Sequence, residues 1–385
     1  MGRKPAKNVP WYKQFRHWNN ESQRYIAAYK RIPKDSALQA EIRGYGKLCS
    51  MRLVFESNLL ENAGLSEGET RKVLEDFPEV NRYDAFHKVG SLLESVLNPR
   101  QISFEQVSHA FKEQGISFDK STPRLIFGKK SRQTLEVIQH YQALLLAEEF
   151  TLSFNMQLTL YYLSQIIRKQ FPDRSDAEQK WREYLRLINE KENISSDITD
   201  PLLITEEVIR NVHKEIGEGL LKDSQVPAGE YRDDVRHITG TEIVLPSPEL
   251  IPSAMTAYTK RSNASLKDAL VAPEKRMLTA AKISYEFARI HPFPDFNGRV
   301  SRLILMMILR TFGVPFPVTL KGNKKHKKWY NDALKRANKD DLFAYATLIA
   351  MRVVESFQEV DENIKKAGLP SILSFYPKDQ ETPSS

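Results

Sequence analysis

Residues 291–302, which read HPFPDFNGRVSR, place a histidine, an aspartate, an Asn-Gly pair and two arginines close together. The apolar residues that follow recur at the i, i+3, i+4 spacing of a buried helix face, so a loop-to-helix junction is expected here. A histidine can act as a general base and an aspartate can bind Mg²⁺. Arginines and free backbone N–H groups bind phosphate oxygens. Together these groups predict the transfer of a phosphate-containing group to a hydroxyl.

Arg299 and Arg302 fall in the first turn of the expected helix, three residues apart and therefore neighbours in space. The helix dipole makes this end positive, so two unpaired cations here would be mildly destabilising. An anion bound to both guanidinium groups and to the free backbone N–H groups would remove that cost. The two arginines therefore favour a phosphate site.

The other polar residues of this stretch have expected roles of their own. Asn297 should cap the helix, and Asn297-Gly298 should adopt the positive φ that turns backbone amides toward a phosphate. Asp295 would hold the Mg²⁺ that accompanies a nucleoside triphosphate. His291, fixed before Pro292 at the end of the preceding helix, would be the general base. Each residue alone is more often structural, so the prediction depends on all of them occurring in this order.

The stretch closely resembles the signature of the Fic (Fic/Doc, Fido) family, most members of which transfer AMP from ATP to a hydroxyl of a target protein. The resemblance implies that His291 deprotonates the target hydroxyl and that Asp295 binds Mg²⁺. It also implies a target protein that offers a Ser, Thr or Tyr hydroxyl, and it allows modification of the chain itself.

The same resemblance assigns the phosphates of ATP. Asn297, Gly298 and Arg299 would hold the α- and β-phosphates, and Arg302 the γ-phosphate. Phe296 departs from the family, which usually has glycine there. The donor therefore stays open, with UMP, phosphocholine or phosphate transfer as alternatives, together with a degenerate adaptor that binds nucleotide without reacting.

Segments on both sides of the stretch resemble the family as well. The segment from about Ile238 to Pro248 resembles the flap that pins a target segment by strand-like pairing. Downstream, WYNDALKRANKDDL resembles the nucleotide-binding helix, with Tyr330 and Asn338 as candidates near the adenosine. The resemblance covers roughly 203–357 well and 80–200 hardly at all. The candidate flap residues are Ile238, Gly240, Ile243 and Val244.

FESNLLENAGLS, at 55–66, contains Ser57, Glu61 and Asn62. On a helix, positions 57 and 61 share a face. The motif resembles the Ser/Thr-x-x-x-Glu-Gly/Asn inhibitory motif of the family, and its position before the signature implies the class with an N-terminal inhibitory helix. By this resemblance Glu61 pairs with Arg302 and prevents the γ-phosphate from binding productively, so basal activity should be low.

The dominant period of the chain is helical. Residues 227–252 combine prolines and glycines with the β-prone TEIV, which predicts a short hairpin or extended flap. The fold class is therefore mainly α: a Fic-type helical bundle with a short β-hairpin flap, plus N-terminal and inserted helices. The expected helices are one at about 37–62 capped by Ser36, two within 131–171, one at 175–191, one opened by Thr205, and one ending at about His291.

Four regions are expected along the chain. Residues 80–200 could be a partner-binding or dimerising module or a scaffold, so a homodimer is one possibility. The regions are an N-terminal helical region at 1–79 with the inhibitory helix, an accessory region at 80–200, a Fic catalytic core at 201–360 and a C-terminal tail at 361–385.

The composition is that of an ordinary globular protein, with 41% hydrophobic and 28% charged residues. No apolar run approaches the ~20 residues of a membrane span, and the N-terminus lacks the apolar segment of a secretory signal. Cys49 is the single cysteine, which excludes an internal disulfide. A cytoplasmic protein is therefore expected. The net charge of +8 is scattered along the chain, so we expect no dedicated nucleic-acid surface.

Overall fold

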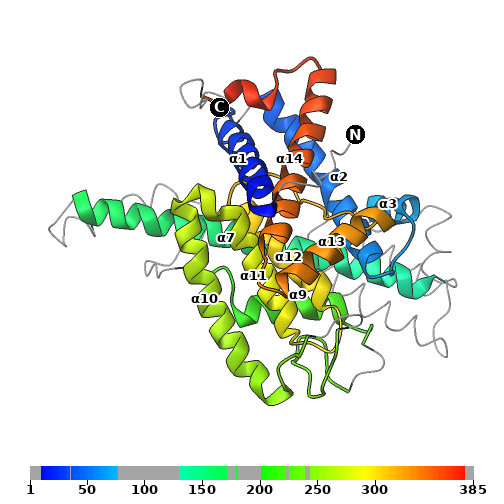
Figure 1. Cartoon of the computed structure of the whole chain (residues 1–385). Helices are drawn as coiled ribbons and strands as arrows, with labels where there is room; N and C mark the ends of the chain where they lie inside the picture. Colours follow the sequence, from blue (N-terminus) through cyan, green and yellow to red (C-terminus); the bar gives the residue numbers. More distant parts are fainter. Residues whose placement is uncertain are drawn as a thin grey trace.

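The structure is a computed structural model that describes residues 10–34, 36–76, 130–170, 179, 201–221, 225–238 and 243–377. Within these ranges the chain forms helices and loops, and none of these residues lies in a strand. The mainly α fold expected from the sequence is confirmed (Figure 1). No helix of the described ranges is long and apolar enough to cross a membrane.

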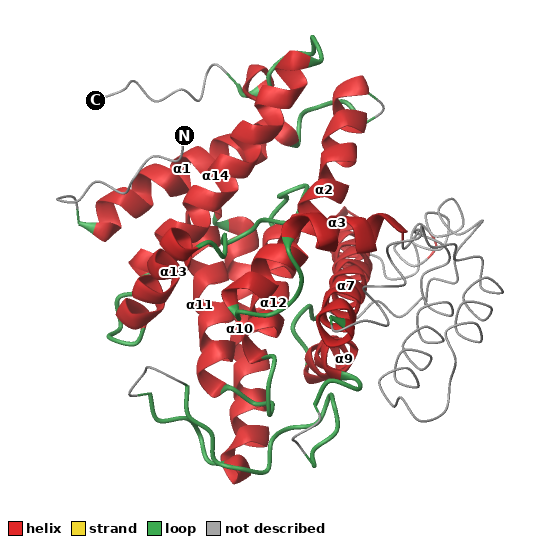
Figure 2. Ribbon diagram, turned by 90° about the vertical axis from the view of Figure 1, so that its right-hand side faces the viewer, coloured by secondary structure: helices red, strands yellow, loops and turns green. Residues whose placement is uncertain are grey.

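Two antiparallel neighbours, α11 (Arg276–Ile290) and α12 (Asn297–Thr311), form the centre of the molecule. Almost the whole of α12 is buried, because α11 covers one side and α7 (Ser131–Gln170) another. Figure 2 shows α12 between these two helices. The predicted end of α11 is confirmed, since His291 is its C-cap residue. The junction between α11 and α12 therefore lies at one end of the core.

The helix predicted at about 37–62 is α2 (Ala37–Leu60). Its start follows the expected chemistry, because the Ser36 hydroxyl accepts a hydrogen bond from the Gln39 N–H at 3.2 Å. Its end also does, because Asn62 has a φ of 57° and turns the chain away from the helix. The final turn of α2 lies against α12 and carries Ser57.

One helix replaces the two that were predicted within 131–171. The chain is continuous in α7 through Gln170, because no glycine or proline interrupts these residues. The first half of α7 packs against α9 (Glu206–Gly217), α12 and α2, so this part of the accessory region belongs to the same core as the junction. The helix predicted at 175–191 lies outside the described residues, apart from residue 179.

The helix predicted to begin after Thr205 is α9, and the Thr205 hydroxyl accepts from the Val208 N–H at 3.1 Å. The segment after it is extended, but the predicted hairpin pairing is not seen in residues 225–238 and 243–247. The buried Arg232 side chain connects the two arms instead, since it donates to the carbonyl oxygens of Asp234 and Pro246. Residues 239–242 lie outside the described residues.

The C-terminal region stays packed beyond the boundary expected at 361. That boundary falls inside α14, whose apolar stripe continues through Val360 and Ile364, and Ile372 is buried as well. The other domain boundaries remain predictions. The remaining helices are α1 (Trp11–Tyr29), α3 (Glu67–Asp76), α10 (Ile251–Val271), α13 (Lys324–Ala337), α14 (Phe343–Lys366) and the 3₁₀ turns Pro248–Leu250, Pro273–Lys275 and Ile372–Phe375.

Candidate active site

The junction between α11 and α12 turns at two residues with left-handed backbone. His291 has a φ of 52° and Phe296 a φ of 59°, and Phe296 is the N-cap residue of α12. The prediction that Asn297 caps the helix and that Asn297-Gly298 takes the positive φ is therefore wrong. Asn297 is the first helical residue, and its amide side chain holds the loop by accepting from the Phe293 N–H at 3.0 Å and donating to the Phe293 oxygen at 2.8 Å.

The side chain of His291 is oriented by its own helix. Its Nδ1 lies 3.2 Å from the carbonyl oxygen of Ala288, which can only accept, so Nδ1 carries the proton and Nε2 has a free lone pair. Burial lowers the pKa of His291 below its ordinary value. The His291 carbonyl oxygen accepts from Arg232 Nε at 2.8 Å. The result is a neutral imidazole on a fixed loop, which is what a general base requires.

Asp295 is the exposed carboxylate of the loop. Its Oδ1 accepts from the N–H of Phe296 at 2.6 Å, which fixes the carboxylate beside the start of α12. A single exposed carboxylate next to a phosphate site is a donor set that suits Mg²⁺, which takes one or two carboxylates and completes its shell with phosphate oxygens and water. The residues present therefore fit such an ion.

The pair predicted between Glu61 and Arg302 is formed. Arg302 Nη2 lies 2.7 Å from Glu61 Oε1, and Arg302 Nε donates to Ser57 Oγ at 2.7 Å. Burial opposes ionisation of Glu61, but the charge and hydrogen bond of Arg302 outweigh it and lower the pKa of Glu61. A Cβ atom at Gly298 would collide with the Glu61 carboxylate, so only glycine allows this approach.

Arg299 has a different environment. It is 3% exposed, and its Nη2 lies 3.6 Å from Glu136 Oε2, while its Cζ lies 4.8 Å from the centre of the Phe296 ring. Its Nε and Nη1 have no hydrogen-bond partner among the described residues. Burial lowers the pKa of Arg299. Two unpartnered guanidinium donors at a helix N-terminus suit an oxyanion.

Phe296 does not project into open space. Its ring is 5% exposed and lies between the Arg299 guanidinium and α9, where a Cβ at Gly217 would be 3.4 Å from the ring. The ring centre is 6.3 Å from that of His213. The bulky residue at this position therefore packs into the protein behind the junction.

The helix α7 contributes residues that sequence reasoning missed. Glu136 contacts Arg299, and His140 Nδ1 lies 2.9 Å from Oδ1 of Asn58 in α2. Burial, followed by the charges of Arg299 and Arg302, holds the pKa of His140 well below its ordinary value. These residues carry no local motif, so nothing in the sequence separates them from an ordinary helix face. Arg232, whose side chain holds the carbonyl oxygen of His291, was also missed.

The other predicted residues come from α13, the end of α2 and the flap. Tyr330 is buried beside Arg302, and burial raises the pKa of its hydroxyl. Asn338 accepts from the Tyr285 hydroxyl at 2.8 Å, and Asn62 accepts from Lys327 Nζ at 2.8 Å. In the flap, Ile238 and Ile243 are half-buried and Val244 is 89% exposed. Gly240 lies outside the described residues.

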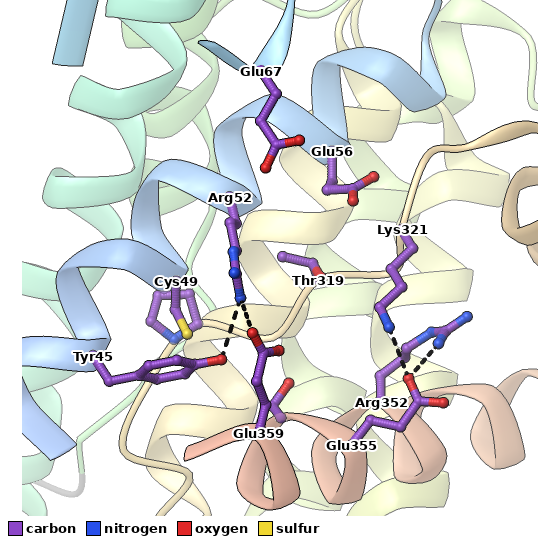
Figure 3. A pocket seen from close by; sticks show the side chains of 12 residues that line it. Tyr45, Cys49, Arg52, Glu56, Glu67, Thr319, Lys321, Arg352, Glu355 and Glu359 are labelled. Atoms are coloured by element: carbon purple, nitrogen blue, oxygen red, sulfur yellow. Dashed lines mark hydrogen bonds and ion pairs between the residues drawn. The ribbon is translucent and has the colours of Figure 1, made fainter. Parts of the chain in front are cut away.

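A polar cavity of about 250 Å³ lies on the other side of α2, between α2, α14 and residues 317–321 (Figure 3). Arg52 of α2 joins Tyr45 to Glu359 of α14, and Glu56 accepts from the Gly322 N–H. Lys321 Nζ lies 3.1 Å from Glu355. The helix α2 is thus also held by polar contacts on a second face, away from Arg302.

The chain is similar to known proteins over the part that builds this site. Residues 203–309 match the model of the Fic/DOC family. The Protein adenylyltransferase Fic of Culex quinquefasciatus is 33% identical over 125 residues, which are 32% of this chain and 23% of that protein. A Fido domain-containing protein of Dictyostelium discoideum is 29% identical over 103 residues, 27% of this chain and 68% of that protein.

Similarity of fold extends further than similarity of sequence. A Fic domain containing signaling protein from Bacteroides thetaiotaomicron covers 91% of this chain and 99% of its own length, with a TM-score of 0.53 and 16% identity. This match supports the expected Fic-type helical bundle. The chain spans only 23% of the length of the first adenylyltransferases it matches, in Culex quinquefasciatus and Aedes aegypti.

Proposed function

This chain is a Fic family protein, and we propose that it transfers AMP from ATP to a hydroxyl group of a target protein. The observation that carries the proposal is the buried Arg299, whose Nε and Nη1 find no partner among the described residues. They lie at the N-terminus of α12, one short loop from Nε2 of His291. An anion site beside a neutral base suits phosphoryl chemistry on a hydroxyl.

In the proposed reaction His291 Nε2 accepts the proton of the target hydroxyl, whose oxygen attacks the α-phosphorus of ATP. The bond from the α-phosphorus to the bridging oxygen breaks, and pyrophosphate leaves. The N–H groups of Asn297, Gly298 and Arg299 have no intrahelical acceptor, because the first such bond of α12 joins Val300 N to Phe296 O at 3.0 Å. These N–H groups and the Arg299 guanidinium bind the α- and β-phosphates.

Asp295 holds the Mg²⁺ in this proposal. When bound, the ion neutralises charge on the phosphates. The exposed carboxylate of Asp295 and its bond to the Phe296 N–H support this role. Tyr330 and Asn338 line the adenosine side. The flap residues Ile238 and Val244, with Gly240 and Ile243, present the target segment.

We further propose that α2 inhibits the protein. Glu61 occupies Arg302, the residue assigned to the γ-phosphate, so ATP cannot bind in the reactive pose while the pair persists. Ser57 strengthens the pair by accepting a hydrogen bond from Arg302. Asn62, with its positive φ, turns the chain directly after Glu61. The Glu61 side chain is 40% exposed, in contrast to 5% for Arg302, so it can leave without crossing the core.

The test is transfer of label from α-labelled ATP with Mg²⁺, to the chain itself and to proteins of a lysate, read by mass spectrometry. The inhibitor-free variant Glu61→Gly should show adducts of AMP mass on Ser, Thr or Tyr. Unlabelled UTP and CDP-choline as competing donors decide the transferred group. An inactive Glu61→Gly variant that still binds ATP would favour an adaptor and overturn the proposal.

A further inference from the structure

Arg299 and Arg302 each face one carboxylate, and the two carboxylates differ in how they are held. Glu61 is the C-cap residue of α2, at the end of its helix, and its side chain is 40% exposed. Glu136 lies inside the 40-residue helix α7, and its side chain is 9% exposed. One carboxylate can leave with a helix end, whereas the other is part of the core.

Glu136 is itself fixed from two further directions. Its Oε2 accepts from the backbone N–H of Gly64 at 3.2 Å, and its Oε1 lies 3.4 Å from Arg132 Nε. These contacts orient the carboxylate toward Arg299, whose Nη2 is 3.6 Å away. The Nη2 nitrogen of Arg299 is directed at Glu136, and within the part of the chain that the structure describes Nε and Nη1 have no hydrogen-bond partner. Glu136 can therefore keep its contact while Arg299 binds an anion.

The second support of Arg299 is the Phe296 ring, 4.8 Å from its Cζ. Between a ring on one side and a carboxylate on another, the guanidinium has little freedom to rotate. A donor group held in this way binds an oxyanion without a further loss of side-chain entropy. Burial and the charge of Arg302 both lower the pKa of Arg299, and the charge of Glu136 acts in the opposite direction.

We propose that Glu136, from the accessory helix α7, is a positioning residue that holds Arg299 in place for the phosphate groups of the nucleotide. The inference rests on the proposed function, because it assumes that the anion at Arg299 belongs to ATP. It gives the first half of α7 a part in nucleotide binding that acts through Arg299.

The experiment measures binding of ATP with Mg²⁺, and of adenosine, to the full chain by calorimetry. The parent carries Glu61→Gly, so that Arg302 is free. Glu136→Gln in this parent should weaken ATP binding about tenfold and leave adenosine binding unchanged, because adenosine has no phosphate for Arg299 to hold. Glu136→Asp, which keeps the charge, should recover part of the loss. Glu149→Gln, an exposed carboxylate on the same helix, is the matched control and should have no effect.

Three outcomes would overturn the inference. ATP binding could be unchanged in Glu136→Gln, ATP and adenosine could weaken equally as expected for general damage to the fold, or Glu136→Gln without Glu61→Gly could raise activity, which would make Glu136 a competitor of phosphate. Thermal unfolding of each variant shows whether a loss of binding comes from damage to the fold. Binding does not depend on transfer, so a parent that binds ATP but modifies nothing overturns the proposed function and leaves this inference standing.

Discussion

Arg302 and Glu61 lie 241 positions apart in the sequence and 2.7 Å apart in the structure. The pair brings together two short motifs, the junction at the start of α12 and the last turn of α2. Because Arg302 is also bonded to the Ser57 hydroxyl and backbone oxygen, the end of α2 is clamped onto the N-terminal part of α12. The consequences of this clamp can be measured.

Replacing Glu61 by glycine should raise transfer of AMP by about tenfold or more, because it removes the carboxylate that competes with the γ-phosphate. Initial rates of label transfer from α-labelled ATP would measure the rise. Adding His291→Ala should abolish it. A rise that survives His291→Ala would show that the chemistry does not use this base.

The pH dependence of the Glu61→Gly variant should follow His291. Burial lowers the pKa of His291 below its ordinary value, so the base is neutral at pH 7. Activity should stay level from about pH 8 to about pH 7 and fall only at lower pH, as the imidazole is protonated. The wild-type chain should stay inhibited over this range, since the pKa of Glu61 is lowered and the clamp is lost only as the pH falls below the ordinary range of a glutamate. A large loss of activity between pH 8 and 7 would contradict this assignment.

Gly322 should control the position of α2 through contacts other than those of Arg302. A Cβ atom there would lie 2.6 Å from the Glu56 oxygen and 2.8 Å from Leu59 Cβ, so Gly322→Ala must displace α2 near Ser57. We expect basal transfer to rise several-fold and the melting temperature to fall. The matched control is Gly44→Ala within α2 itself, where a Cβ meets nothing within 4 Å. That variant should gain about 0.5–1 kcal/mol of stability without any change in activity.

Two substitutions of Phe296 separate the destabilisation caused by its left-handed backbone from the stabilisation that its buried ring contributes. Phe296→Ala loses the ring and keeps a Cβ at a φ of 59°, whereas Phe296→Gly loses both the ring and the strain. Both should be destabilised, because the ring is 5% exposed, but the glycine variant should be more stable than the alanine variant by about 1 kcal/mol. Chemical denaturation measures the difference. Equal stabilities would mean that the backbone at this position is unstrained.

The sequence was informative where the chemistry is local. The residues from His291 to Arg302 and the motif from Ser57 to Asn62 are short contiguous stretches, and their spacing on helices could be worked out in advance. The backbone was predicted less well: the residue expected to cap α12 is inside it, and the positive φ falls on a phenylalanine. Statistical preference favours Asn-Gly for such turns, whereas here the positive φ belongs to Phe296, whose ring packs against α9.

Residue spacing could not predict contacts between distant segments, and the pair of Glu61 and Arg302 was expected only from the resemblance to the family. Glu136 and His140 belong to a helix whose pattern is that of an ordinary amphipathic segment, and their role exists only once α7 packs on α12. The same is true of Arg232, which is one arginine among many until the flap folds over the His291 loop. Residues that position a site from elsewhere in the chain have no spacing rule that would identify them.

Arg232 should affect the rate of transfer more than the binding of ATP. It is 2% exposed and donates to the carbonyl oxygens of His291 at 2.8 Å and Pro246 at 2.7 Å. It therefore fixes the loop that carries His291 to the flap, and these bonds do not involve Arg299 or Arg302. Lysine cannot reproduce this fork of donors. In the Glu61→Gly chain, Arg232→Lys should therefore lower kcat about tenfold and leave the KM for ATP nearly unchanged.

The control for Arg232→Lys is Arg236→Lys, because Arg236 pairs with Asp234 through a side chain that is 40% exposed. Exposed pairs contribute at most about 1 kcal/mol, so this variant should keep the parental kcat. If Arg232→Lys instead raised the KM for ATP at constant kcat, Arg232 would act on the nucleotide directly. The loop that carries His291 would then be held in place by Asn297 and its two bonds to Phe293 rather than by the flap.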